Sequence, residues 1–276
     1  MFKLHSHAYN AWHAVYENDY DAAINFLKKV KKPDENERKW VGQILTKAVN
    51  EEKVDFLGQA LYAIPLNEYS KELTTAAVSK PKILQTLVDM NCADNSRISE
   101  AVEQRNWESA DILKKIGGKP TVDSITTAVK AAVFDANIDD VKKSLSHGNN
   151  IVPVFEGLMA SLKSGNSSLI TMFSEKIKYK QEHLEQPYHS KGEIKLPIIA
   201  QVAQMGTMPS ATTDFFGSYV DYLETLPKES KELTVKMLEN CATANNNTQA
   251  LEMLNSIMLK PVQVTVQPGK SPIFSH

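Results

Sequence analysis

Apolar residues recur along this chain in short runs with helical spacing, and polar turns separate the runs. In the first run Ala8, Ala11 and Val15 share one helical face, and Asn18-Asp19 interrupts it before the apolar spacing resumes. The same alternation predicts successive helix pairs over residues 7–30, 37–64, 71–92, 98–117, 125–148 and 154–174. Further helices are predicted over residues 196–203, 215–223 and 233–259.

Leucines of the predicted second helices recur at a nearly regular interval. They are Leu27, Leu57, Leu87, Leu113 and Leu145, separated by 30, 30, 26 and 32 residues. A period of this length is typical of stacked repeats, in which each helix pair buries its apolar stripes against its neighbours. The pattern therefore predicts an all-α fold, an α-solenoid of stacked helix-turn-helix repeats, with a concave face that suits a protein partner.

Residues 98–153 carry the most regular version of this unit. Ile98-x-x-Ala101 opens it, a polar turn ends at Asn106, Ala110-x-x-Leu113 forms the second helix, and Gly117 marks the exit. Residues 125–153 repeat the scheme. In these features the chain resembles a degenerate ankyrin-repeat protein, although the Thr-Pro-Leu-His opening of that family is absent from both units. The resemblance implies stacked helix-turn-helix units.

The period fails after Phe173, because the next equivalent position, Leu223, lies 50 residues later. The extra residues are polar and include Pro187 and Gly192. The predicted organisation is an N-terminal ankyrin-like array over 1–175, an insertion or junction over 176–195, C-terminal helical pairs over 196–259 and an extended tail over 260–276. Loops that depart from a repeat are frequent functional sites.

Composition narrows the class of protein. The formal net charge is −2 and the pI is about 6.4, which argues against a general nucleic-acid binder. No run of 18 apolar residues is present, so no membrane-spanning helix is expected, and the first residues lack the apolar core of a signal peptide. Cys92 and Cys241 are interpreted as reduced thiols. We expect a cytoplasmic protein, or one delivered into a host cell without a cleaved signal peptide.

Motifs that carry chemistry are sparse. Gly269-Lys270-Ser271 resembles the end of a phosphate loop, but Val264 stands where that loop requires glycine. His5, His7 and His13 have no second cluster with metal-ligand spacing. We therefore predict no cofactor, no metal site and no catalytic residue.

The leading hypothesis is a non-enzymatic protein-interaction module acting as adaptor, inhibitor or host-directed effector. Another protein would bind the concave face, the repeat turns and the 176–195 insertion. The candidate contact residues are Arg105, Trp107, Phe134, Asn137, Tyr179 and Tyr188.

Two alternatives stay open. The first is an enzyme of unfamiliar type with a site at the repeat break, using His183, Glu185, His189 and Tyr188. The second is RNA binding along the lysines of residues 28–32 and 176–180, which the acidic pI disfavours.

Overall fold

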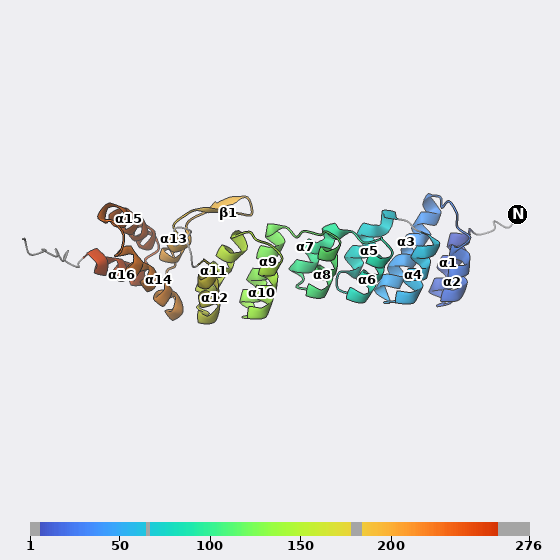
Figure 1. The fold of residues 1–276 in the computed structure, drawn as a ribbon, viewed down its shortest axis with the longest axis horizontal. Coiled ribbons are helices and arrows are strands. Elements are labelled where there is room, and N and C mark those ends of the chain that lie inside the picture. Colours follow the sequence, from blue (N-terminus) through green and yellow to red (C-terminus); the bar gives the residue numbers. More distant parts are fainter. Residues whose placement is uncertain (1–5, 65–66, 178–183, 259–276) are drawn as a thin grey trace, which may run out of the picture. The chain divides into compact units, whose positions relative to one another are not determined.

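The computed structural model describes residues 6–64, 67–177 and 184–258, and its described part is all-α apart from one β-hairpin (Figure 1). The prediction of an all-α fold is confirmed. The chain divides into two compact units, Met1–Gly157 and Leu158–His276. This division falls inside α11 (Val152–Ser164), earlier than the 176–195 junction inferred from the repeat period. None of the helices in the described ranges combines the length and apolar character needed to cross a bilayer.

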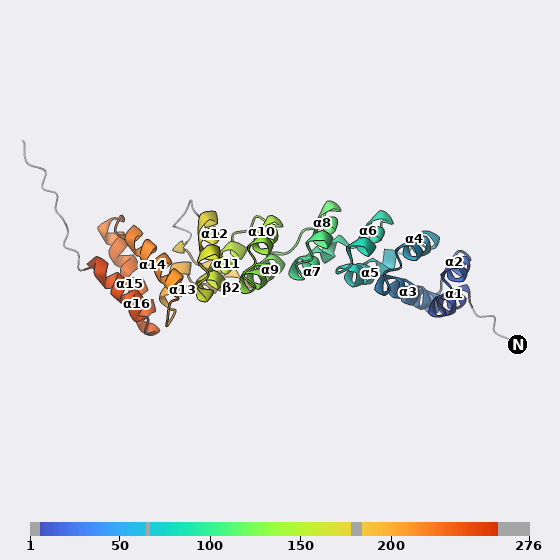
Figure 2. The same ribbon diagram turned by 90° about the horizontal axis from the view of Figure 1, so that it is seen from below.

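The N-terminal unit consists of consecutive helix pairs. They are α1 (His7–Tyr16) with α2 (Tyr20–Leu27), α3 (Glu35–Asn50) with α4 (Val54–Ala63), α5 (Ser70–Ala77) with α6 (Pro81–Asp89), α7 (Ile98–Glu103) with α8 (Trp107–Lys115), and α9 (Val122–Phe134) with α10 (Ile138–Ser146). Short 3₁₀ turns, η1 (Asn67–Tyr69) and η2 (Asn95–Arg97), precede α5 and α7. In this unit the odd-numbered helices lie along one side and the even-numbered helices along the other (Figures 1 and 2).

Neighbouring pairs pack helix on like helix. Helix α1 packs on α3, α3 on α5 and α7 on α9, while α2, α4, α6 and α8 follow one another on the other side. Small residues at these contacts let the helices approach closely, and Ala11, Ala48 and Ala132 are completely buried. Leu57 and Leu113 fill the layers between pairs, and each contributes about 1.5–3 kcal/mol by burial.

Leu145 differs from the other repeat leucines. It is only half-buried, and the buried residues of α10 are Val141 and Ser144. These two residues lie three positions apart and share one face of the helix. Leu145, four positions after Val141, lies at the edge of that face and not at its centre. The regular leucine interval predicted the helix pair correctly but not this residue's burial.

A single turn geometry joins the two helices of most pairs. Its central residue adopts a positive φ, and the following N–H donates to a carbonyl five residues earlier, which satisfies the helix end. The positive-φ residues are Asn18, Glu52, Arg105, Ala136, Gly165 and Asn246. The accepting carbonyls belong to small residues, namely Ala14, Ala48, Ala101, Ala132, Ser161 and Ala242. In most of these turns the next residue is Asn or Asp, whose side chain caps the second helix.

The C-terminal unit continues with α12 (Ser167–Ile177), α13 (Ile198–Ala203), α14 (Ser210–Leu223), α15 (Lys228–Ala244) and α16 (Thr248–Met258). Here α12 packs on α14, α14 on α16 and α13 on α15. The predicted insertion contains strands β1 (Tyr188–Ser190) and β2 (Glu193–Lys195), which pair antiparallel. Lys191 and Gly192 both have positive φ, as a two-residue hairpin turn of type I′ requires.

Candidate interaction surfaces

Two of the predicted contact residues sit in equivalent turns. Arg105 is the positive-φ residue between α7 and α8, and Asn137 caps α10 after Ala136, the positive-φ residue of the next turn. The local backbone bonds of the turn hold both in place: the Asn106 N–H donates to Ala101 O at 2.9 Å, and the Asn137 N–H donates to Ala132 O at 2.9 Å. Their side chains therefore project from neighbouring turns toward a common region.

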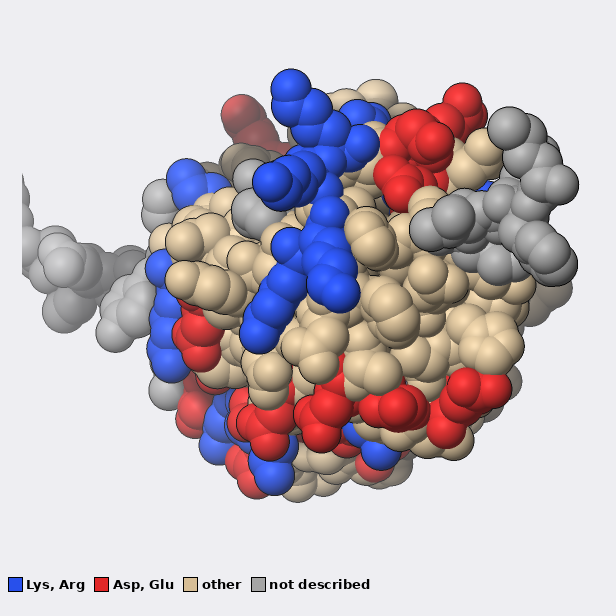
Figure 3. Space-filling view, turned by 90° about the vertical axis from the view of Figure 1, so that its right-hand side faces the viewer, with Lys and Arg blue, Asp and Glu red and all other residues tan. Residues whose placement is uncertain are grey.

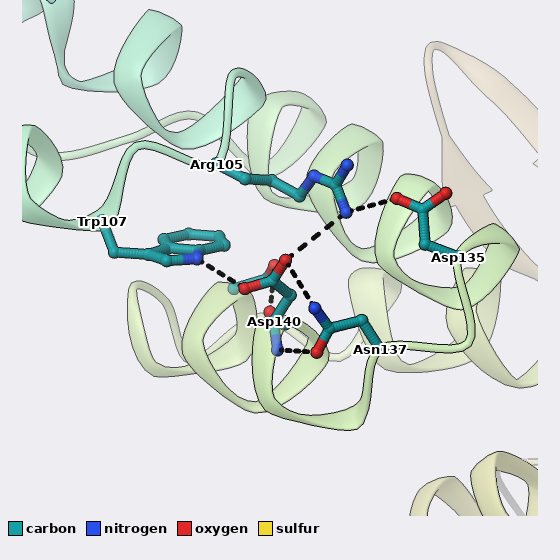
Figure 4. A network of polar contacts seen from close by, with 6 residues as sticks. Arg105, Trp107, Asp135, Asn137 and Asp140 are labelled. Atoms are coloured by element: carbon teal, nitrogen blue, oxygen red, sulfur yellow. Dashed lines mark hydrogen bonds and ion pairs between the residues drawn. The ribbon is translucent and has the colours of Figure 1, made fainter. Parts of the chain in front are cut away.

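That region is a polar network centred on Asp140 (Figure 4). The Trp107 indole N–H donates to Asp140 Oδ1 at 2.7 Å, and Asn137 Nδ2 donates to Asp140 Oδ2 at 3.1 Å. Arg105 Nη1 lies 2.7 Å from Asp135 Oδ2 and 3.4 Å from Asp140 Oδ2. The structure therefore brings Arg105, Trp107 and Asn137 together. Arg105 and Trp107 make contacts to the next helix pair, whereas Asn137 bonds Asp140 within its own pair.

The ring of His147 completes this junction. It stacks on Trp107 with centroids 5.7 Å apart, and its Nε2 lies 4.0 Å from Asp111 Oδ1. Its Nδ1 is buried without a hydrogen-bond partner. Burial and the positive charge of Lys114 lower the pKa of His147, and the Asp111 carboxylate opposes that shift. The neutral imidazole is thus the form that fits the junction.

The other predicted contact residues are scattered. Phe134 ends α9 and is 89% exposed, so its ring is open to a partner. Tyr188 lies in β1 and is 7% exposed, with its hydroxyl 3.5 Å from Gln201 Nε2. Tyr179 lies outside the described residues.

The residues of the enzymatic alternative do not converge in the described part of the chain. Tyr188 and His189 are consecutive in β1 and point to opposite faces, one buried and one exposed. Glu185 accepts a hydrogen bond from the Tyr219 hydroxyl at 2.8 Å, and His183 lies outside the described residues. Within the described ranges, no three His, Cys, Asp or Glu side chains are grouped so as to hold a metal ion.

A hollow of the C-terminal unit lies between α12 and α14, and we call it the α12–α14 groove. Its volume is about 720 Å³. Its larger apolar lining residues are Leu158, Ile170, Ile177, Leu184, Phe215 and Tyr219. Its remaining lining residues are small or polar, namely Ser167, Thr171, Ser174, Glu175, Ala211, Asp214 and Ser218. On α12 these positions recur every three or four residues, so one face of that helix lines the groove.

Polar groups of this groove are arranged differently from those of the Asp140 network. The Ser174 hydroxyl is buried without a hydrogen-bond partner. Glu175 and Asp214 supply the charges, and no lysine or arginine is among the described lining residues. Burial, the hydrogen bond to Glu185 and its negative charge raise the pKa of Tyr219 far above the usual tyrosine value, so its hydroxyl stays a donor.

Little in the sequence indicates this groove. Ile170 and Phe215 were assigned to helices, but Ser174 and Ser218 are residue types common on solvated helix faces. A detectable signal is the spacing of Ser167, Ile170 and Ser174, which defines a second stripe beside the core-facing residues of α12.

No family model, no curated protein and no solved structure matches this chain.

Proposed function

We propose that this protein is a protein-interaction module and that the α12–α14 groove binds an apolar segment of its partner. The observation that carries the proposal is the groove itself. A volume of about 720 Å³ falls in the range of ligand sites, and six sizeable apolar or aromatic side chains line it. The ring of Phe215 is half-buried, and aromatic side chains are enriched in protein–protein interfaces.

The helical walls suggest the form of the partner segment. An amphipathic helix laid in an apolar groove inserts residues spaced three or four apart, and the lining residues of α12 have the same spacing. The Ser174 hydroxyl, buried without a partner, offers a hydrogen bond to a polar group of the bound segment. An apolar helical face with one polar position is the simplest occupant.

The charge of the groove lining indicates which charge the partner segment carries. The carboxylate of Asp214 lines the groove, and the described lining contains no basic side chain. Complementary charge favours a segment with lysine or arginine beside its apolar face. We therefore expect a basic amphipathic helix rather than an acidic one.

The helix pairs of both units support the wider assignment. We infer a degenerate ankyrin-type solenoid, acting as an adaptor, inhibitor or host-directed effector in a cytoplasm. Packing of like helix on like helix and the shared left-handed turn support that inference. Phe134, 89% exposed at the end of α9, is a separate candidate contact on the N-terminal unit.

A displayed library of peptides about 20 residues long, enough for a helix of roughly 30 Å, tests the proposal directly. The protein should enrich peptides with apolar residues at helical spacing and flanking lysine or arginine. Ser218→Arg and Thr171→Arg each place a cation in the groove and should weaken the selected peptide at least about tenfold, which is about 1.4 kcal/mol.

Ser168→Arg is the matched control, because Ser168 is exposed on α12 and does not line the groove. It should bind the peptide like the unaltered protein. Equal binding by all three variants, or selection of peptides without an apolar helical face, would refute the assignment.

A further inference from the structure

The first helix pair has an outward face, formed by the side of α2 that points away from α1 and α4. Ala23, Ile24 and Leu27 of α2 are buried, on the side that faces α1 and α4. At 100° per residue, Ala22 and Asn25 point the opposite way, and neither is buried. The centre of this outward face is therefore made of small, uncharged side chains.

Charges of opposite sign flank this uncharged centre. Acidic residues surround the start of α2, namely Glu17, Asp19 and Asp21, and exposed lysines follow its end, namely Lys28, Lys29, Lys31 and Lys32. Figure 3 looks onto this end of the N-terminal unit. Lysine and arginine form a strip in its upper part, and uncharged surface separates this strip from a row of aspartate and glutamate near the lower edge. Some basic side chains lie below and beside that row, and a smaller acidic group lies beside the upper strip.

Such separation is not what a solvated terminal repeat needs. End repeats stay soluble by a polar outer face, and mixed charges of both signs serve that purpose best. An uncharged centre between a basic and an acidic edge is instead a self-complementary arrangement. Rotation by 180° about an axis in the face exchanges the two edges and sets unlike charges opposite each other.

We propose that this face pairs with the same face of a second copy of the chain, in a two-fold dimer with the two α2 helices antiparallel. Helix α2 has 8 residues and is therefore about 12 Å long, so long lysine side chains at one end reach carboxylates at the other copy's opposite end. Ala22 and Asn25 at the crossing point allow close approach of the helices.

A hollow between α2 and α4 strengthens the fit. Its volume is about 410 Å³, and Asp21, Glu52 and Asp55 are among its lining residues. Lys53 is the one basic residue of its described lining, and its Nζ lies over the Tyr20 ring at 5.2 Å. The hollow lies on the side of α2 that faces α4, and its carboxylates add to the negative charge of the acidic edge beside the outward face.

Sedimentation velocity on the full chain tests the dimer through charge reversal. The unaltered protein should dimerise with increasing concentration, and salt near 1 M, with a Debye length of about 3 Å, should weaken the dimer. Lys28→Glu/Lys29→Glu cancels the positive charge of the basic edge, because Lys31 and Lys32 remain, and Glu17→Lys/Asp21→Lys makes the acidic edge basic. Each variant alone should dimerise at least about tenfold more weakly. An equimolar mixture of the two should restore a dimer.

Lys142→Glu/Lys143→Glu is the control, since it changes the charge equally on exposed positions of α10 and should leave the dimer intact. Thermal melts establish that each variant is folded. A chain that stays monomeric to about 100 µM overturns the proposal, as does a dimer that survives both reversals or a mixture that fails to associate.

Discussion

The junction around Asp140 and the α12–α14 groove both lie between consecutive helix pairs, yet they are built in opposite ways. In the junction, the indole N–H of Trp107 and the guanidinium of Arg105 both reach carboxylates of the next pair. In the groove, apolar side chains line open space and the Ser174 hydroxyl is buried without a partner. The Nδ1 of His147 in the junction is also buried without a partner, so the difference lies in the carboxylates. Those of the junction hold two repeats together, whereas the groove presents apolar side chains to open space.

Hydrogen-bond energetics explain why this difference matters. Bonds to charged groups contribute about 1.5–3 kcal/mol, and an unpaired buried polar group costs about 1–3 kcal/mol. A tryptophan at a polar turn therefore indicates a partner-binding residue only if its N–H is unpaired, and that of Trp107 donates to Asp140.

The largest expected effect is at the turn next to the groove. Gly165 has φ +68, and an added Cβ would lie 2.5 Å from Pro209 Cβ. Gly165→Ala should destabilise the C-terminal unit by about 3 kcal/mol, from left-handed strain and overpacking together. Urea unfolding followed by circular dichroism measures it.

Tryptophan fluorescence supplies the internal control for that variant. Trp12, Trp40 and Trp107 all belong to the N-terminal unit, so their unfolding signal should not move in Gly165→Ala. An unchanged dichroism transition would contradict the strain at this turn.

Replacing Asp140, the centre of the polar junction, should cause the next largest loss of stability. Asp140→Ala leaves the Trp107 N–H and one contact of Arg105 without their acceptor, and should cost about 2 kcal/mol in the N-terminal unit. The fluorescence-detected urea midpoint reports it. The neighbouring Asp139→Ala, at an exposed position, should cost less than about 1 kcal/mol. Equal losses in the two variants would show that the network adds nothing to stability.

A feature of this structure is predictable from the sequence when the residues that form it lie close together along the chain. Helix pairs follow from local spacing, so their existence was predictable from runs such as Ala8 to Val15. The hairpin over residues 188–195 was missed because its strands have three residues each. The hydrogen bond of the Trp107 indole N–H could not be predicted from the sequence, because its acceptor Asp140 lies 33 residues away. The groove was missed because Ser174 and Ser218 resemble solvated positions.

Lowering the pH should destabilise the N-terminal unit, because His147 in the junction is buried in its neutral form. Its pKa is lowered in the folded protein, so the unfolded chain takes up the proton first as the pH falls. The stability of the N-terminal unit should therefore be retained above the ordinary histidine pKa of about 6.5 and decline below it, down to the lowered folded-state pKa. Fluorescence-detected unfolding at a series of pH values measures the slope.

His147→Phe keeps a ring against Trp107 and removes the titrating group. Its stability should depend less on pH in that window than the stability of the unaltered protein. Parallel pH profiles for the two proteins would exclude His147 as the source.

The smallest expected effect is at Ser174. Ser174→Ala removes a buried hydroxyl that has no partner, so stability should stay equal or rise by up to about 1 kcal/mol. Ser144→Ala is the contrast, because the Ser144 hydroxyl donates to Asp140 O at 2.7 Å, and it should cost about 1 kcal/mol. If Ser174→Ala lowered stability more than Ser144→Ala, the hydroxyl of Ser174 in the groove would not differ from the paired hydroxyl of Ser144 as described.

The most direct test is amide hydrogen exchange of the full chain with and without a peptide selected from the library. Binding in the groove predicts slower exchange over 167–177 and 210–223, the residues of α12 and α14, and unchanged exchange over 98–146. Slower exchange confined to 98–146, with α12 and α14 unaffected, would contradict the account and return partner recognition to the turns around Trp107.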